Sequence, residues 1–294
     1  MKVIGVLARA DLLEAGPTVR ELVEWLDQRG VRSCLDSATS ALGGVGDMAG
    51  CRVATGRQVA AEADALVVLG GDGTLLAASR LLERTVPVLG VNFGSLGFLT
   101  EIALPELYAT LEAVLEDRHQ SEERRLLHAV VRRTGKPDVE GDVLNDVVIT
   151  KGGASRIIEL DVSVDSLFVS AFRADGLIVS SPTGSTAYNL AAGGPILHPA
   201  LPAVVLTPIC PHMLTNRPLV VSDESTVEVC LRAERGVDVQ VTFDGQRGFP
   251  LSSDDSVVVT RSPRTLRLVK AEGRDFFGVL RTKLKWGEGT TRKP

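Results

Sequence analysis

The stretch that decides the fold is ALVVLGGDGT, at residues 65–74. Its first five residues are apolar, which is typical of a strand buried on both faces in a parallel sheet. Three glycines around one aspartate follow, and residues 74–83 then have a helical pattern. A strand that enters a helix through such a loop exposes backbone N–H groups beside the helix N-terminus, a suitable place for phosphate. The stretch therefore predicts a phosphate-binding loop; a tight turn with a capping aspartate is the alternative without a ligand.

The segments around this loop repeat the alternation of strand and helix. Residues 2–7 and 87–91 are compact apolar runs, and amphipathic helices are expected from Pro17 to Gly30 and from Pro105 onward. Apolar strands that alternate with helices indicate a parallel sheet covered on both faces. Residues 1–120 are therefore predicted to form a doubly wound α/β domain.

The pattern changes at about residue 121. Short, often alternating apolar segments separated by turn signals then predict an all-β domain over residues 121–264. We expect its strands at residues 126–132, 143–150, 157–164, 167–173, 176–180, 203–209, 226–231, 238–243 and 256–261. The overall prediction is an N-terminal α/β domain followed by a β-rich, β-sandwich-like domain. The last residues, 265–294, return to a helix- and coil-like composition, and we expect this tail to pack back on the first domain.

Composition excludes several classes of function. The formal charge is −5 and the basic residues are scattered, which argues against a nucleic-acid surface. No apolar stretch approaches the roughly 20 residues that a membrane helix requires. The 4 cysteines are far apart and form no CxxC pair, so free thiols in a reducing compartment are expected. These features predict a soluble cytoplasmic protein with neither nucleic acid nor membrane as a partner.

Asp72 is the one carboxylate of the glycine loop. Phosphate would repel it unless a cation or a hydroxyl proton engages it, so Asp72 is suited to orienting or deprotonating an attacking hydroxyl, or to a contact through Mg²⁺. The sequence has no GxxxxGK[ST] motif, which excludes a P-loop NTPase. A relaxed GxGxxG-type match at residues 44–49 follows no convincing strand, and we do not assign it to a dinucleotide.

A second polar segment lies at residues 173–196, where a strand runs into a loop rich in Ser, Thr and Gly and then into a short helix near residues 184–190. Such a loop offers many small donors and acceptors, which suits a polyhydroxylated or phosphorylated ligand. A solvent-exposed loop of the β domain is an equally good interpretation of its composition.

Several motifs together resemble those of the NAD kinases. They are GGDG at 70–73, VNFGSLGFLT at 91–100, Asn145-Asp146, the block 175–196, PICPH at 208–212 with Arg217-Pro218, and Asp244-Gly245-Gln246. GGDG alone also occurs in diacylglycerol and sphingosine kinases and in phosphofructokinases. The block 175–196 with Asn145-Asp146 is the specific part of the resemblance.

The resemblance implies an NAD kinase, which transfers a phosphoryl group from ATP or another donor to the 2′-hydroxyl of the adenosine ribose of NAD and makes NADP. Asp72 then takes the position of the proton acceptor and contacts NAD together with Gly73. The phosphate donor is expected at Gly70, Gly71 and Gly73. The other NAD contacts carried over from the family are Asn145, Asp146, Arg156, Arg173, Asp175, Thr186, Ala187, Tyr188, Asn189, Leu190, Ala191 and Gln246.

The resemblance also implies partners. A divalent cation, Mg²⁺, is expected to arrive with the phosphoryl donor, and no residue of the chain is assigned as its ligand. In many members of the family one ligand contact comes from a neighbouring subunit, so a homodimer or homotetramer is expected. Ala77 stands where many relatives carry a basic residue, so a phosphate contact there is lost.

Two other functions remain to be compared with this one. A lipid kinase would share the GGDG loop but would need a hydrophobic slot, and the block 175–196 favours a nucleotide. A non-catalytic dinucleotide sensor would keep the binding residues without turnover, and the presence of Asp72 argues against it.

Overall fold

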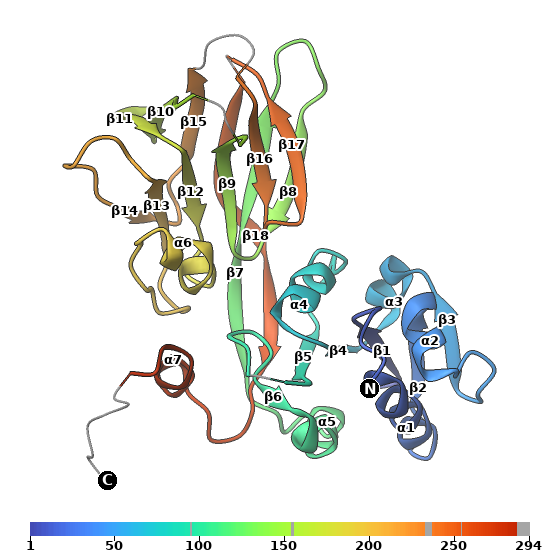
Figure 1. The fold of residues 1–294 in the computed structure, drawn as a ribbon. Helices are drawn as coiled ribbons and strands as arrows, with labels where there is room; N and C mark the ends of the chain where they lie inside the picture. The colour runs from blue at the N-terminus through green and yellow to red at the C-terminus, as the bar shows by residue number, and fades with distance from the viewer. Residues whose placement is uncertain (95, 154–155, 233–236, 254, 287–294) are drawn as a thin grey trace. The chain divides into compact units, whose positions relative to one another are not determined.

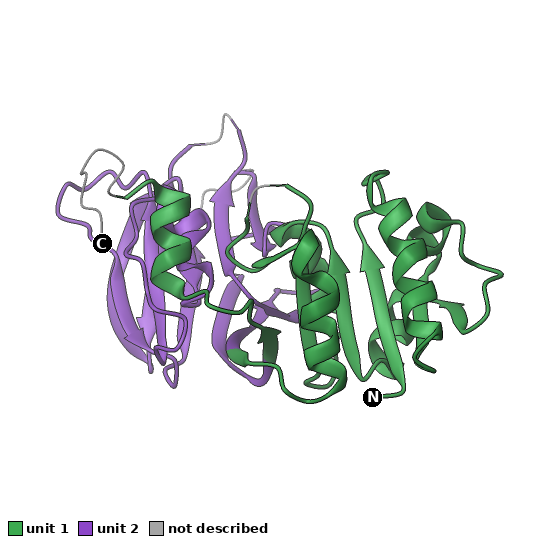
Figure 2. Ribbon diagram, turned by 90° about the horizontal axis from the view of Figure 1, so that it is seen from below, with its two compact units in different colours: residues 1–123, 266–294 green, residues 124–265 purple. Residues whose placement is uncertain are grey.

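The computed structural model describes residues 1–94, 96–153, 156–232, 237–253 and 255–286 (Figure 1). The chain divides into two compact units, which Figure 2 distinguishes by colour. Unit 1 comprises Met1–Glu123 with Leu266–Pro294, and unit 2 comprises Arg124–Thr265. The predicted domains, 1–120 with 265–294 and 121–264, divide the chain at nearly the same places.

Unit 1 is built on a parallel sheet with the strand order β5-β4-β1-β2-β3. Its strands are β1 (Val3–Ala8), β2 (Arg32–Asp36), β3 (Cys51–Ala54), β4 (Ala65–Leu69), β5 (Pro87–Asn92) and the short β6 (Ile102–Ala103). The helices are α1 (Ala15–Asp27), α2 (Ser37–Gly43), α3 (Gly56–Glu62), α4 (Asp72–Ser79), the 3₁₀ helix η1 (Leu104–Glu106), α5 (Leu107–Leu115) and α7 (Phe276–Leu284). The predicted α/β domain is confirmed.

The hydrophobic pattern of the sequence explains the core of unit 1. All of β4 is buried, and α1 buries one face at Val19, Leu22, Val23 and Leu26. These side chains pack with those of β1, β5 and α5 in one hydrophobic cluster. Helix α1 begins at Ala15 and not at Pro17, because proline is tolerated anywhere in the first turn, where its missing N–H has no helical acceptor.

The helix that follows the glycine loop is shorter than predicted. It runs over Asp72–Ser79, whereas the sequence suggested residues 74–83. Gly71 is its extended N-cap, and Asp72 lies in the first turn, where the helix dipole favours a negative charge. The helix therefore begins within the loop, and Asp72 belongs to the helix N-terminus.

The described part of the tail belongs to unit 1, as predicted. Val269 and Ala271 join its hydrophobic core, and the Lys270 N–H donates to the Gln120 carbonyl at 2.9 Å. The Arg274 guanidinium pairs with both oxygens of Glu106 at 2.9 Å and also donates to the Glu101 carbonyl. Packing and an ion pair thus fix the chain after the last strand.

Unit 2 contains antiparallel strands of two sheets. The first has the order β14-β13-β12-β9-β16-β17 and consists of β9 (Asp146–Lys151), β12 (Gly176–Ser180), β13 (Ala203–Ile209), β14 (Leu219–Ser222), β16 (Val239–Phe243) and β17 (Arg247–Leu251). The second is the antiparallel part of a mixed 12-stranded sheet, which also includes the parallel strands of unit 1 because the end of β18 pairs with β5. This antiparallel part contains β7 (Ser121–Arg132), β8 (Val139–Val143), β10 (Ile158–Val164), β11 (Leu167–Ala174), β15 (Val227–Arg232) and β18 (Ser256–Val269). Both β7 and β18 begin or end in unit 1.

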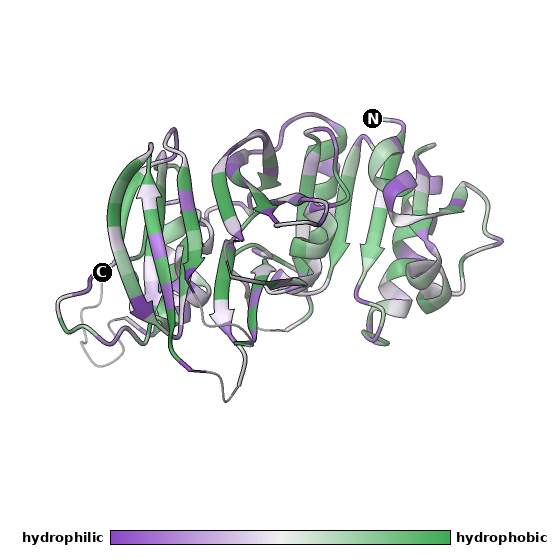
Figure 3. Ribbon diagram, turned by 90° about the horizontal axis from the view of Figure 1, so that it is seen from above, coloured by the Kyte–Doolittle hydropathy of each residue, from purple (hydrophilic) through white to green (hydrophobic). Residues whose placement is uncertain are grey.

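One hydrophobic cluster fills the space between the sheets of unit 2. Val147 and Val179 come from the first sheet, and Leu160 and Val257 come from the second. Green, hydrophobic stretches mark the strands of both units in Figure 3. A common core between two antiparallel sheets confirms the predicted β-sandwich-like domain.

The segment between β12 and β13 carries little regular structure. It contains the 3₁₀ helix η2 (Gly184–Thr186) and the single-turn helix α6 (Tyr188–Ala191), close to the short helix expected near residues 184–190. Among the helices of the described residues, none is long and apolar enough to cross a membrane.

Candidate active site

The glycine loop of unit 1 follows directly from the end of β4 at Leu69. Gly70 has a φ of +153°, and a Cβ there would lie 2.5 Å from Thr74 Oγ1, so this position requires glycine. Gly71 and Gly73 differ, because no atom of the described residues beyond their chain neighbours lies within 4 Å of a Cβ built at either position. The packing of the chain itself therefore gives no reason for glycine at 71 and 73, and the space beside them is open.

Backbone amides of a distant loop hold the carboxylate of Asp72. Phe98 N–H donates to Oδ2 at 2.8 Å, whereas the N–H groups of Leu99 and Thr100 donate to Oδ1 at 3.1 and 3.0 Å. Thr100 Oγ1 also donates to Oδ1, at 2.9 Å. Oδ1 thus accepts three hydrogen bonds, while Oδ2 accepts one and keeps capacity for another.

The close approach of this loop depends on Gly97. A Cβ at Gly97 would lie 2.0 Å from Asp72 Oδ1 and 2.3 Å from Thr100 Oγ1. Asn92 Nδ2 in turn donates to Thr100 Oγ1 at 3.2 Å, so an amide, a hydroxyl and a carboxylate form a chain. The sequence motif 91–100 had no assigned role, and the structure shows that it orients Asp72; Ser95 lies outside the described residues.

In unit 2, Asp244 holds the segment that carries Asn145 and Asp146. Its Oδ1 accepts the N–H groups of Asn145 and Asp146 at 2.7 and 3.1 Å, and its Oδ2 accepts Leu144 N–H at 3.0 Å. Asp244 has a φ of +51°, as a turn residue, and its own N–H donates to the Asp146 carbonyl at 2.9 Å. The Asp-Gly turn after β16 therefore fixes the backbone between β8 and β9.

The serines that follow β12 fix the same segment from the other side. Ser181 N–H and Ser180 Oγ donate to the Asn145 carbonyl at 2.9 and 3.2 Å, and Ser181 Oγ donates to the Leu144 carbonyl at 2.5 Å. A Cβ at Gly184 would lie 2.2 Å from the Asn145 carbonyl oxygen. The first hydroxyls of the Ser/Thr-rich loop thus stabilise the protein and are not free for a ligand.

Two polar side chains of this segment have no partner within the described residues. Asn145 Oδ1 is buried without a hydrogen bond. Asp146 is only 4% exposed, and none of the described residues forms a hydrogen bond with its carboxyl group. Burial, and to a smaller degree the charge of Asp244, raises the pKa of Asp146 from 3.8 to about 7.

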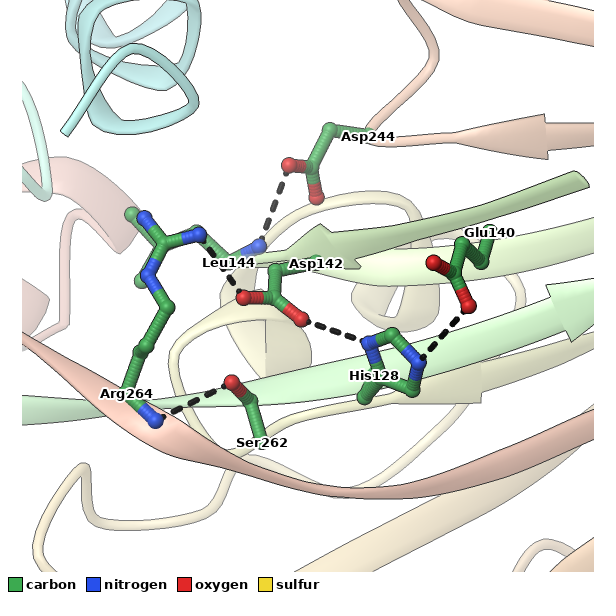
Figure 4. A network of polar contacts seen from close by, with 7 residues as sticks. All are labelled: His128, Glu140, Asp142, Leu144, Asp244, Ser262 and Arg264. Atoms are coloured by element: carbon green, nitrogen blue, oxygen red, sulfur yellow. Dashed lines mark hydrogen bonds and ion pairs between the residues drawn. The ribbon is translucent and has the colours of Figure 1, made fainter. Parts of the chain in front are cut away.

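A further polar network lies on β8, just before this segment. Figure 4 shows the Asp142 carboxylate between His128 Nδ1, at 2.8 Å, and the Arg264 guanidinium, at 2.9 Å. His128 Nε2 also lies 3.8 Å from Glu140, and Arg264 N–H donates to Ser262 Oγ. This network links β7, β8 and β18, and its central residue, Asp142, lies two residues before Leu144. The sequence alone did not indicate it.

The remaining predicted contacts lie at the surface of unit 2 or only partly buried. Asp175 pairs with Lys151 at 3.3 Å, and the exposed Arg173 lies 3.9 Å from Glu159. Arg156 and Gln246 are exposed. In the block after β12, the half-buried or exposed residues are Thr186, Ala187, Tyr188, Leu190 and Ala191.

Asn189, also predicted to contact NAD, differs from this set in its burial. The residue is fully buried, and its Nδ2 donates to the carbonyls of Ser185 and Pro195, both at 3.0 Å. Its Oδ1 accepts the Thr207 hydroxyl at 2.6 Å. Internal hydrogen bonds therefore use its amide, and Asn189 closes the loop instead of presenting a side chain to NAD.

Comparisons with known proteins agree with this arrangement. The family model described as the ATP-NAD kinase N-terminal domain matches residues 4–119, and that of the ATP-NAD kinase C-terminal domain matches residues 144–271. The chain belongs to the NAD kinase family. The NAD kinase of Citrifermentans bemidjiense is 48% identical over 98% of this chain and 100% of its own length. That of Solibacter usitatus is 46% identical over 98% of this chain and 99% of its own length.

Solved structures show the same fold. A yeast NADH kinase, determined with NADH, matches with a TM-score of 0.88 at 22% identity, over 100% of this chain and 90% of its own. An NAD kinase from Archaeoglobus fulgidus, determined with ATP, matches with a TM-score of 0.73 at 25% identity, over 96% of this chain and 98% of its own.

The NAD kinase activity predicted from the resemblance is confirmed by these relatives. The chain is a kinase that phosphorylates NAD at the 2′-hydroxyl of its adenosine ribose and forms NADP. Neither a lipid kinase nor a non-catalytic sensor is favoured by any of these matches.

Proposed function

We propose that Asp72 accepts the proton of the NAD 2′-hydroxyl through Oδ2 during phosphoryl transfer. The observation that carries this assignment is the unequal occupation of the carboxylate, since Oδ1 accepts three hydrogen bonds and Oδ2 accepts one. Three backbone amides and one hydroxyl fix its position before the substrate arrives. Such preorganisation places a base without reorganisation at the moment of reaction.

In the proposed step the ribose oxygen attacks the terminal phosphorus of the donor. The O–H bond breaks as the new O–P bond forms, the proton passes to Asp72 Oδ2, and the bond to the leaving nucleoside diphosphate breaks. The donor in this proposal is ATP. The family description names ATP, and the similar Archaeoglobus fulgidus enzyme was determined with ATP.

The open space beside Gly71 and Gly73 accommodates the donor phosphates in this proposal. A phosphate oxygen can approach the backbone closely there because no side chain fills the space. Gly73 also lies in the first turn of α4, where the helix dipole favours an anion. Gly70, also assigned to the phosphate donor in this proposal, forms the turn that begins the loop.

A divalent cation, Mg²⁺, accompanies the phosphates. Over the described ranges no group of three His, Cys, Asp or Glu side chains forms a metal site. When bound, the cation neutralises charge on the transferred phosphoryl group. In this proposal the backbone N–H groups of residues 98–100 position Asp72, and Asp72 orients the 2′-hydroxyl of NAD.

The other half of the proposal assigns NAD recognition to Asp72, Gly73 and a set in unit 2. A buried polar atom without a partner, such as Asn145 Oδ1, is costly unless a ligand satisfies it, and the adjacent Asp146 is only 4% exposed. The exposed guanidinium groups of Arg156 and Arg173 supply positive charge for the pyrophosphate of NAD. The members in unit 2 are Asn145, Asp146, Arg156, Arg173, Asp175, Thr186, Ala187, Tyr188, Leu190, Ala191 and Gln246.

Unit 2 also carries a surface suited to self-association into the proposed homodimer or homotetramer. Leu167 and Phe168, on the sheet-edge strand β11, are 72% and 67% exposed. Clustered exposed apolar side chains on an edge strand favour pairing with another chain. Light scattering should show Phe168→Lys dissociating the oligomer, while Phe277→Lys, on α7 of unit 1, leaves it intact.

We propose a cytoplasmic location. All cysteines in the chain are free thiols, as a reducing compartment maintains them.

The proposed donor and base are tested by one enzyme-coupled assay of NADP formation from NAD with Mg²⁺. ATP and polyphosphate are supplied in parallel, with wild type and Asp72→Asn. We expect NADP with ATP and wild type, and a rate reduced by a factor on the order of 10²–10⁴ with the variant. Equal rates for the two proteins would refute the role of Asp72, and activity with polyphosphate alone would refute ATP as the donor.

A further inference from the structure

The carboxyl groups of Asp146 and Asp244 form a buried acidic pair with very unequal surroundings. Asp244 is 7% exposed, and its two oxygens accept three backbone N–H groups, one of them from Asp146 itself. Asp146 is 4% exposed, and the described part of the chain gives its carboxyl no donor. Two neighbouring buried carboxyls resist double ionisation, so a shared proton belongs on the one that lacks donors.

In the part of the chain that the structure describes, no basic side chain forms an ion pair with Asp146. Arg247, opposite Phe243 on β17, has its guanidinium near Gly141 of β8. Opposite Asp146, β12 places the uncharged Ser180, and Asp244 lies at the end of β16 beyond Phe243. On β7 and β18, the charged groups of His128 and Arg264 both pair with Asp142 of β8. Burial and the charge of Asp244 are accordingly the two causes that raise the pKa of Asp146 to about 7.

We infer that Asp146 binds NAD in its protonated form and donates its carboxyl hydrogen to an acceptor atom of the dinucleotide. This inference rests on the proposed placement of NAD at Asn145 and Asp146. An ionised Asp146 could only accept hydrogen bonds and would add a negative charge beside an anionic ligand. Asn145 Oδ1, buried without a partner, remains the acceptor of the segment. The two adjacent side chains thus present one donor and one acceptor.

The protonated state makes the affinity for NAD depend on pH in a defined direction. Above the pKa of Asp146 the free enzyme must take up a proton to bind, so the Kd rises about tenfold for each pH unit. Below that pH the Kd is constant. Asp146→Asn has nearly the shape of the protonated acid and keeps both a donor and an acceptor, so it should bind at all pH values.

The test is calorimetric titration of NAD into wild type, Asp146→Asn and the control Asp138→Asn between pH 6 and pH 9. Asp138 is an exposed aspartate of the same unit. We expect wild type and Asp138→Asn to lose affinity at least tenfold from pH 7 to pH 9, while Asp146→Asn changes less than threefold. Affinity that increases with pH in wild type, or the same pH dependence in Asp146→Asn, would overturn the inference.

A second measurement separates this inference from the site assignment. The ¹³C resonance of the Asp146 carboxyl, identified by its absence in Asp146→Asn, reports its protonation without NAD. A titration near pH 7 supports the inference, and one below pH 5 overturns it whatever NAD does. A titration near pH 7 combined with a wild-type NAD affinity that does not change between pH 6 and pH 9 would instead refute the donor role, because NAD then binds elsewhere.

Discussion

Asp72 of unit 1 and Asp244 of unit 2 use the same device for different purposes. Each carboxylate accepts three consecutive backbone N–H groups, those of residues 98–100 for Asp72 and those of residues 144–146 for Asp244. Asp72 lies beside open space at Gly73, and one of its oxygens keeps capacity for a substrate proton. Asp244 is buried in a turn and acts through the residues that it holds. Three backbone N–H donors are therefore common to both carboxylates. The difference that makes Asp72 a reacting group and Asp244 a supporting one is the exposure of the carboxylate.

The largest expected effect comes from Asp72→Asn, which removes the proton acceptor. The turnover number for NADP formation should fall by a factor on the order of 10²–10⁴, the usual contribution of a general base. The dissociation constant for NAD should stay within a few-fold, since the contacts in unit 2 remain. Initial rates and calorimetry on the same preparation measure both quantities, and a rate within threefold of wild type would contradict the assignment.

The next effect concerns stability and pH at Asp146. Its pKa is about 7 in the folded protein and near 3.8 when unfolded, so the folded state keeps the proton while the unfolded chain releases it between these values. Stability from this group is therefore present at low pH and is lost as pH rises toward 7. Asp146→Asn should match wild type near pH 4 and be more stable at pH 8 by on the order of 4 kcal/mol. Urea unfolding at both pH values measures the difference, and a difference of opposite sign at pH 8 would exclude a raised pKa.

A steric substitution tests the loop that orients Asp72. Gly97→Ala places a methyl group where Asp72 Oδ1 lies 2.0 Å away, so the loop must move and the carboxylate with it. We expect turnover to fall by a factor of roughly 10–100, the scale of misplacing a reacting group by about 1 Å. Gly94→Ala is the matched control, because its nearest neighbour, Asn92 Oδ1, lies 3.9 Å from the added methyl. Equal rates for the two variants would show that the loop does not position Asp72.

The smallest expected effect is that of Thr100→Val. This change removes one of the three hydrogen bonds to Oδ1 and the link to Asn92, but leaves the backbone amides in place. A single hydrogen bond to a charged group contributes about 1.5–3 kcal/mol, part of which the amides retain. Turnover should fall about three- to tenfold with an unchanged Michaelis constant for NAD. A fall as large as that of Asp72→Asn would assign the hydroxyl a role in the chemistry itself.

The sequence predicted the buried elements better than the exposed ones. Strands β12 and β13 match their predicted ranges because nearly all their residues are apolar and buried. Edge strands such as β3, β14 and β17 were missed, since their largely half-buried or exposed residues leave no hydrophobic alternation. The predicted strand 143–150 corresponds to β9, which begins only at Asp146, because Asp244, about 100 residues further along the chain, accepts the backbone N–H groups of Leu144 and Asn145.

The candidate site shows the same division between local and distant causes. The glycine loop and Asp72 could be found because strand, glycines and helix are adjacent in the chain. The partners of Asp72 lie 26 to 28 residues away in the sequence and donate backbone N–H groups. Because nearly every residue type has such a group, only Gly97 marks this loop in the sequence. Asn189 was assigned to NAD by its place in the motif that resembles the NAD kinases, but whether its amide is used internally depends on Thr207, a residue of another strand.

The division of roles between the two aspartates is tested most directly by one pair of saturation curves. NADP formation with ATP and Mg²⁺ is measured against NAD concentration for Asp72→Asn and Asp244→Asn. Because Asp244 acts through Asn145 and Asp146, its variant should have a Michaelis constant raised about tenfold or more, and saturating NAD should restore its turnover to within about tenfold of wild type. Saturating NAD should not restore Asp72→Asn. Recovery of Asp72→Asn at high NAD, or an Asp244→Asn turnover as low as that of Asp72→Asn, would contradict the account.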